Sequence, residues 1–191
     1  MNYIKPRSLK YSFKDLEPFL SENMLSFHYK SLYCMYVKTF NKALKNRFTS
    51  IVHVIKSNTF LGSHIKYIAL QIYNHNFYWK SMINPRMSII SYFVKQIIID
   101  NFCSIEIFKF LFFQNCLSVF GNGWVWLAKV NNKLIIICTK NSDSLINTIY
   151  KPVLVCDIWE HAYNIDYKSS KLKYLQAWWN VINWDEVGRE C

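Results

Sequence analysis

The first half of the chain repeats apolar residues at the spacing of an α-helix. Four side chains, each four residues from the next, fall on one helical face: His28, Leu32, Tyr36 and Phe40. Ser21 precedes this stripe and is a favoured N-cap residue, so the pattern predicts a long helix from Ser21 to about Arg47. A histidine and a tyrosine therefore share an otherwise apolar face.

A second helical pattern starts near Ser63 and continues to about Met82. Four more positions recur at helical spacing and include one amide and one imidazole: Ile68, Gln71, His75 and Trp79. Ser63 is the expected cap, and Asn84 followed by Pro85 is expected to stop the helix. We expect the two helices to form a hairpin, in which the amide lies one turn before the imidazole.

The second half of the chain mixes helical and strand patterns. The expected elements, in chain order, are helices at 88–99 and 104–119, strands at 125–130, 133–139 and 152–157, and a closing helix at 171–181. Asn131 and Asn132 separate the first two strands, and because asparagine tolerates positive φ, they predict a tight hairpin turn. This order of elements combines a helical first half with a mixed second half.

Pro85 and Arg86 mark the expected boundary between two domains, residues 1–86 and 87–191. With 52% hydrophobic and 18% charged residues in 191, the chain has the composition of a folded protein and not of a disordered tail. Its formal charge of +11 suits an anionic partner, such as nucleic acid, an acidic membrane or a small anionic substrate. The lysines are scattered, which disfavours nucleic acid.

The cysteines and one long uncharged stretch add little chemistry. No CxxC pair occurs among the six cysteines, and we expect reduced thiols that are mostly buried. Residues 110–128 carry no charged side chain, but the glycines at 121 and 123 favour a helix, a turn and a strand over a membrane span. Asp15 and Glu17 lie in an N-terminal region without an apolar signal core, so we expect a cytoplasmic protein with no membrane partner.

The candidate chemistry lies in PVLVCDIWEHAYNIDY, residues 152–167, where a strand pattern ends. Asp157 and His161 stand four residues apart there, and a carboxylate with an imidazole suits iron, manganese or zinc. Further ligands must come from elsewhere in the chain, and His28 and His75 qualify because each lies on an apolar face. Burying an imidazole without a partner costs about 1–3 kcal/mol, and a shared metal would serve both. The other two histidines, at 53 and 64, have no such context.

Four blocks carry a resemblance to a known family. They are FHYKSLYCMYVKTFN (27–41), QIYNHNFYW (71–79), FGNGWVWL (120–127) and DIWEHAYNIDY (157–167). In these blocks, and in their order, the chain resembles the iron/manganese superoxide dismutases over nearly its whole length. The resemblance implies an α+β fold, with an N-terminal long helical hairpin packed on a C-terminal α/β domain that has a three-stranded antiparallel sheet.

The same resemblance implies a function and a ligand set. The family converts superoxide to dioxygen and hydrogen peroxide by redox cycling of one metal ion that lies between the two domains. The implied ligands, with solvent as a fifth, are His28, His75, Asp157 and His161. In the iron type a glutamine from the second helix bonds this solvent, and Gln71 stands at that position. Ser142, in the segment NSDS, replaces the glutamine of most manganese enzymes. Iron is therefore expected, with manganese possible.

Other site residues are also implied by the resemblance. Tyr36 matches the tyrosine that gates the substrate funnel and hydrogen-bonds the glutamine. The aromatic wall around the metal is matched by three tryptophans: Trp79, Trp124 and Trp159. Glu160 matches the carboxylate that orients the ligand histidine of a second subunit, which makes a homodimer the expected assembly.

The chain departs from the family pattern at the entrance to the site. Leu32 and Asn164 stand where the family usually has a histidine and a tyrosine that meet across the dimer interface. Lys171 and Leu172 replace a usual arginine and proline nearby. These changes keep open a non-catalytic relative that binds metal as a structural or interaction protein. The basic charge keeps open a second alternative, a nucleic-acid-binding module.

Overall fold

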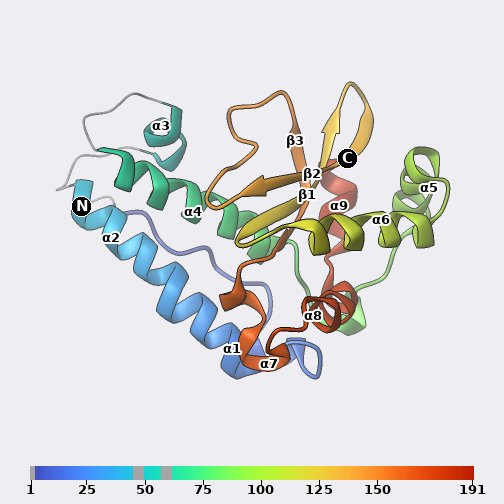
Figure 1. Ribbon diagram of the computed structural model, residues 1–191, viewed down its shortest axis with the longest axis horizontal. Coiled ribbons are helices and arrows are strands. Elements are labelled where there is room, and N and C mark those ends of the chain that lie inside the picture. Colours follow the sequence, from blue (N-terminus) through green and yellow to red (C-terminus); the bar gives the residue numbers. More distant parts are fainter. Residues whose placement is uncertain (1–2, 45–49, 57–61) are drawn as a thin grey trace.

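The computed structural model describes residues 3–44, 50–56 and 62–191. Its helices are α1 Glu22–Ser26, α2 Cys34–Leu44, α3 Ile51–Lys56, α4 Gly62–Lys80, α5 Tyr92–Phe102, α6 Ile105–Ser118, α7 Asn164–Tyr167, α8 Lys171–Trp178 and α9 Trp184–Glu190. Its strands are β1 Gly123–Val130, β2 Lys133–Lys140 and β3 Lys151–Asp157. Figure 1 shows the long helices of the first half on one side of the molecule and the sheet with its covering helices on the other. The expected α+β architecture is confirmed.

The first long helix begins where the sequence predicts. The side chain of Ser21 accepts a hydrogen bond from the backbone N–H of Met24, so the predicted N-cap is confirmed. From α1 the chain continues through a π-helical segment, Phe27–Tyr33, into α2. The backbone N–H of Cys34 bonds the carbonyl of Tyr29, five residues back, as in a π turn. The predicted end near Arg47 lies outside the described residues.

The π-helical segment changes which side chains face the interior. After the buried His28, the next fully buried side chain is Tyr33, five residues later, and it is followed by Val37 and Phe40. Leu32 and Tyr36, which a regular helix would place directly above His28, are half-buried. The prediction that Leu32 and Tyr36 line the buried face is therefore wrong by one residue, and Tyr33 and Val37 line it instead. The π turn contains one extra residue, which rotates the positions that follow it.

The second helix, α4, packs against α2 and against strand β3. The four positions predicted on its inner face are buried: Ile68, Gln71, His75 and Trp79. Ser63 lies inside α4, which begins at Gly62, so it is not the residue that precedes the helix. The helix ends at Lys80, and Asn84 caps the short 3-10 helix Pro85–Met87 that follows. The predicted stop near Asn84 and Pro85 is confirmed to within a turn.

The sheet is antiparallel, with β1 between β2 and β3. Asn131 and Asn132 join β1 to β2 with φ angles of 46° and 62°, which confirms the predicted tight turn. Trp124 pairs with Asp157, the last residue of β3, so the end of β3 lies beside the start of β1. All three predicted strands are confirmed.

The helices after the sheet differ from the prediction at the C-terminal end. A helix was expected over 171–181, and α8 followed by the 3-10 helix Trp179–Val181 occupies it. A further helix, α9, was not expected. The side chain of Asn183 accepts from the backbone N–H of Glu186 and caps it, and α9 packs against β3 and α5. The hydrophobic pattern missed α9 because the helix is short.

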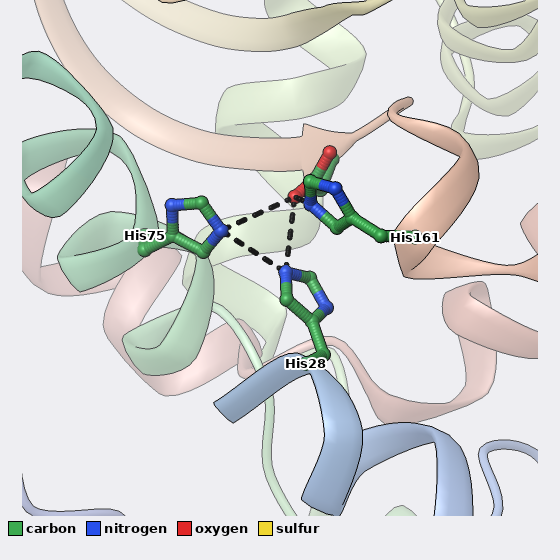
Figure 2. A group of neighbouring side chains, drawn as sticks. His28, His75 and His161 are labelled. Atoms are coloured by element: carbon green, nitrogen blue, oxygen red, sulfur yellow. Dashed lines mark hydrogen bonds and ion pairs between the residues drawn. The ribbon is translucent and has the colours of Figure 1, made fainter. Parts of the chain in front are cut away.

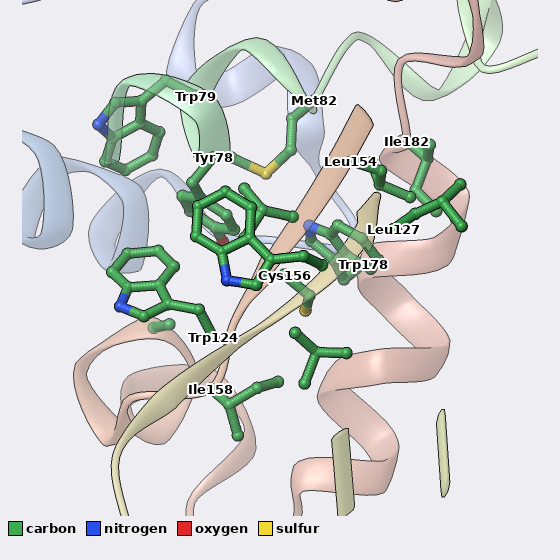
Figure 3. Packing of buried hydrophobic residues seen from close by; sticks show 14 of the residues in the cluster. Tyr78, Trp79, Met82, Trp124, Leu127, Leu154, Cys156, Ile158, Trp178 and Ile182 are labelled. Atoms are coloured by element: carbon green, nitrogen blue, oxygen red, sulfur yellow. The ribbon is translucent and has the colours of Figure 1, made fainter. Parts of the chain in front are cut away.

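The core lies between the sheet, α4 and the C-terminal helices. Figure 3 shows Trp79 and Trp124 on one side of the cluster and Leu127, Trp178 and Ile182 on the other. All six cysteines are free thiols. Cys116 and Cys156 are buried, but the other four are half-buried or exposed, so the expectation that most are buried is wrong. None of the helices in the described ranges is both long and apolar enough to cross a bilayer.

Candidate metal centre

Four side chains from four separate segments meet in the interior. The four residues are His28 of the π-helical segment, His75 of α4, Asp157 at the end of β3, and His161 of the 3-10 helix Glu160–Ala162. Each offers one ligand atom, and these atoms all lie within 4.8 Å of one another. Figure 2 shows the rings of the three histidines turned toward a common point. The structure therefore brings together the four ligands that the sequence suggested.

The distances centre on one carboxylate oxygen. Asp157 Oδ2 lies 3.3 Å from Nε2 of His28, 3.3 Å from Nε2 of His161 and 3.8 Å from Nε2 of His75. The Nε2 atoms of His28 and His75 are 3.1 Å apart (Figure 2). Three imidazole nitrogens and one carboxylate oxygen make a donor set that suits iron, manganese or zinc. The residues present therefore fit a single metal ion.

Burial sets the protonation states of these groups. Desolvation lowers the pKa of His28 from its usual 6.5 to about 4 and that of His75 to about 3, so both rings are neutral near pH 7. Burial alone would raise the pKa of Asp157, but the adjacent His161 and His28 hold it below its usual value. Neutral imidazoles and an ionised carboxylate are the forms that bind a cation.

Backbone groups orient two of these side chains. Nδ1 of His75 lies 2.7 Å from the carbonyl oxygen of Gln71, one turn earlier on α4. A neutral ring that donates from Nδ1 keeps the lone pair of Nε2, which is the atom that faces the cluster. The backbone N–H of Trp159 donates to Oδ1 of Asp157 at 2.9 Å, which leaves Oδ2 for the histidines. The local geometry thus presents ligand atoms inward.

Aromatic rings surround the cluster. Each of the three predicted tryptophans lies beside one histidine. Between ring centroids, Trp79 is 4.8 Å from His28 and Trp124 is 5.0 Å from His75. Trp159 is 5.4 Å from His161. Sequence reasoning missed two more. Tyr33 stacks on His75 at 5.9 Å, and Tyr78 lies 5.3 Å from His28. The π-helical segment brings Tyr33 to this face, and no helical repeat in the sequence signals that change.

Gln71 is fully buried one turn before His75, and its amide nitrogen donates to the hydroxyl of Tyr67 at 3.1 Å. The resemblance implied a direct bond between Gln71 and Tyr36. Among the described residues the amide's hydrogen-bond partner is instead Tyr67, so the structure does not show the implied bond. Burial raises the pKa of Tyr36, and the nearby Tyr67 and Asp157 raise it further. Tyr67 was not singled out in the sequence.

Ser142 lies close to α4 and is buried. Its carbonyl oxygen accepts from the side chain of Asn74 at 3.2 Å. The segment that holds the serine therefore packs next to the helix that carries Gln71. The short side chain of Ser142 stands at the position that the resemblance matches to the glutamine of most manganese enzymes. This placement leaves Gln71 as the buried glutamine beside the cluster.

The remaining candidate residues lie toward the surface. Glu160 and Asn164 are exposed, and Leu32 is half-buried. Among the described residues, no hydrogen bond reaches Nδ1 of His161, whose Nε2 faces Asp157. The two histidines left out of the candidate site, at 53 and 64, are both exposed, as expected.

Two family models match the chain in succession. The alpha-hairpin domain of the iron/manganese superoxide dismutases matches residues 5–83, and their C-terminal domain matches residues 91–190. Together these matches cover most of the sequence, and they contain all four residues of the cluster.

Named relatives agree with these matches. The chain is 38% identical over 182 residues to "Superoxide dismutase [Fe]" of Plasmodium falciparum, covering 93% of this chain and 90% of the relative. It is 34% identical over 186 residues to "Superoxide dismutase [Fe]" of Entamoeba histolytica, with 94% of each covered. It is 35% identical over 208 residues to "Superoxide dismutase [Mn]" of Buchnera aphidicola, covering 98% of this chain and 97% of the relative. The chain belongs to the iron/manganese superoxide dismutase family.

Proposed function

We propose that this protein is an iron-dependent superoxide dismutase whose single iron is held by His28, His75, Asp157 and His161. The observation that carries the proposal is the convergence of these four ligand atoms within 4.8 Å in the interior. The chemistry that iron supplies when bound is a one-electron exchange, in which one superoxide is oxidised to dioxygen and the next is reduced, with two protons, to hydrogen peroxide.

The chain's own residues prepare this site. Three neutral imidazoles and one ionised carboxylate leave a small positive net charge with a divalent or trivalent cation, which suits an anionic substrate. Trp79, Trp124 and Trp159 cover the histidines and limit the access of water, which lowers the local dielectric. The overall charge of +11 favours encounter with an anion at low salt.

Gln71 and Tyr36 are the proposed catalytic residues next to the metal. The amide of Gln71 is buried one turn before His75, where it can hydrogen-bond a solvent molecule in the site. The ring of Tyr36 lies 5.8 Å from that of His75, between centroids, and is half-buried, so it lies between the site and the surface. Tyr36 is therefore placed to control the access of substrate and protons.

Iron is preferred over manganese on two grounds. The buried glutamine comes from α4 and not from the segment that holds Ser142. The relatives from Plasmodium falciparum and Entamoeba histolytica are named for iron, while the relative from Buchnera aphidicola is named for manganese. Manganese remains a possible metal for the same four ligands.

We also propose a homodimer in which Glu160 orients a ligand of the partner. Glu160 is exposed and cannot face its own neighbour His161, because adjacent side chains point in different directions. Nδ1 of His161 needs a hydrogen-bond acceptor, and a carboxylate from a second copy would supply it. A two-fold axis would make this contact reciprocal.

The chain divides into domains 1–86 and 87–191, with two ligands from each, so that the metal holds the domains together. A cytoplasmic role as an antioxidant enzyme fits the activity, and fractionation of the source cells would test the location.

The function is tested by loading metal-free protein separately with iron and with manganese. Dismutation of superoxide is then measured per bound ion. The proposal predicts high activity with iron and at most a small fraction of it with manganese. Equal activity with both metals would remove the preference, and activity with manganese alone would reverse it.

A further inference from the structure

The amide of Gln71 has one hydrogen-bond partner within the described ranges, and it is a tyrosine from the same helix. Nε2 of Gln71 lies 3.1 Å from the hydroxyl oxygen of Tyr67, one turn earlier on α4. The opposite amide atom, Oε1, is buried and has no partner among the described residues. Tyr67 is half-buried, whereas Gln71 is fully buried.

A carboxamide can occupy such a site in two orientations that differ by a half-turn about its last bond. With the nitrogen toward Tyr67, the oxygen of Gln71 stays buried and unpaired, which is unfavourable. With the oxygen toward Tyr67, that oxygen accepts from the hydroxyl, and both N–H groups remain for an acceptor in the site. The hydroxyl of Tyr67 is therefore the group that can select one end of the amide.

Tyr67 is also a neighbour of Tyr36. It lies close enough to raise the pKa of Tyr36, and the Tyr36 ring packs near the ring of His75. One hydroxyl can accept two hydrogen bonds and donate one, so Tyr67 can accept from Tyr36 and donate to Gln71. In that arrangement the three side chains would form a continuous path of hydrogen bonds beside the candidate metal centre.

The two residues expected at the entrance to the site, Leu32 and Asn164, offer no group that could carry a proton to Gln71. Leu32 is apolar, and Asn164 is an exposed amide that does not titrate. Neither residue offers an ionisable group that could hold or relay a proton near neutral pH. Tyr36 and Tyr67 are both half-buried tyrosines, the first beside the ring of His75 and the second bonded to Gln71.

We propose that Tyr67 is a positioning residue, which holds Gln71 with its N–H groups free for the metal centre and links Gln71 to Tyr36. This inference rests on the proposed function and assigns a role to a residue outside the ligand set. Tyr67 acts through Gln71 and is not itself expected to contact the substrate.

The test uses the full chain loaded with iron and the variant Tyr67→Phe. Tyr73→Phe is the matched control, because Tyr73 is a half-buried tyrosine of the same helix whose ring packs on Phe77. Iron content, thermal midpoint, the ferric absorption spectrum and the affinity for azide, an anionic probe, are measured for each protein. These readouts do not depend on turnover.

We expect Tyr67→Phe to bind iron as the parent does and to change the azide affinity by roughly threefold to tenfold, the effect of losing one hydrogen bond. We expect the ferric spectrum to change as well, and Tyr73→Phe to leave both readouts unaltered. An azide affinity and spectrum unchanged by Tyr67→Phe would overturn the inference.

A second comparison asks whether Tyr67 acts through Gln71. In a Gln71→Ala background, Tyr67→Phe is expected to have no further effect on azide affinity, because the two residues form one unit. An equal effect in both backgrounds would contradict the proposed role. If the parent binds iron but does not dismutate superoxide, the proposed function fails, while the azide comparison still decides the role of Tyr67.

Discussion

The Nε2 atoms of His28 and His75 lie 3.1 Å apart in the interior, although the two residues are 47 positions apart in the chain. Both rings are neutral near pH 7, because burial lowers the pKa of each. His75 donates from Nδ1 to a backbone carbonyl, so its Nε2 carries a lone pair and not a proton. A cation between the nitrogens and the oxygen of Asp157 satisfies these groups together.

Removing the carboxylate charge is expected to empty the site. Asp157→Asn keeps the size of the side chain but replaces an anionic ligand with a weaker neutral one. We expect iron affinity to fall by more than about 100-fold, which exceeds the loss seen for partners outside the ligand set. Iron per chain and dismutation should fall together. His64→Gln on the surface of α4 is the control, and its iron content should match the parent.

Acid is expected to destabilise the metal-free protein through its buried histidines. Their folded pKa values, about 4 for His28 and about 3 for His75, lie below the usual 6.5. Below pH 6.5 the unfolded chain therefore binds more protons than the folded chain, so stability falls as the pH drops toward 4. Urea unfolding between pH 7.5 and 4 measures this slope.

The histidine origin of the slope can be checked by substitution. His28→Gln removes one of the two groups, so its stability should depend less steeply on pH over the same range. A slope that is identical in the parent and the variant would assign the acid sensitivity to other groups. Metal-loaded protein should resist acid until protons displace the ion.

Loss of Glu160 is expected to weaken both the dimer and the metal site. Glu160→Ala removes the carboxylate proposed to reach His161 of the other copy, and we expect iron affinity to fall by about 10- to 100-fold. Sedimentation at several protein concentrations reports the dimer directly. Lys168→Ala, another exposed position nearby, is the control. A monomeric parent protein would contradict the dimer, whatever the variant does.

Truncation of a core leucine is expected to cost stability without touching the site. Leu154 of β3 is fully buried within the cluster of Figure 3, and Leu154→Ala should lower the free energy of unfolding by about 2–5 kcal/mol. Ile149→Ala, at a side chain that is 77% exposed, should change it by less than about 0.5 kcal/mol. Urea unfolding of the metal-free proteins compares them.

Much of this architecture is predictable from local sequence signals. Ser21 caps its helix, and Asn131 with Asn132 forms the hairpin turn, because each residue has a strong conformational preference of its own. The three strands follow from runs of β-branched and aromatic residues. The four clustered side chains were singled out by their placement on apolar helical faces and after a strand, and the resemblance to the iron/manganese superoxide dismutases implied that they form one ligand set.

The missed features depend on tertiary contacts. The π-helical segment puts Tyr33 against His75, and no repeat of four residues announces that rotation. The cysteines were expected to be mostly buried from residue type alone, but only Cys116 and Cys156 are, because burial follows position in the fold. The hydrogen bond from Gln71 to Tyr67 could not be predicted from the sequence, because helical spacing shows which residues are near one another but not which of them form a hydrogen bond.

The most direct test of this account is a titration of metal-free protein with iron, with superoxide dismutation measured at each step. We predict that activity rises in proportion to bound iron, stops at one ion per chain, and is absent from Asp157→Asn. A chain that binds one iron at these four residues and yet does not dismutate superoxide would contradict it, and would identify a metal-binding relative without catalysis.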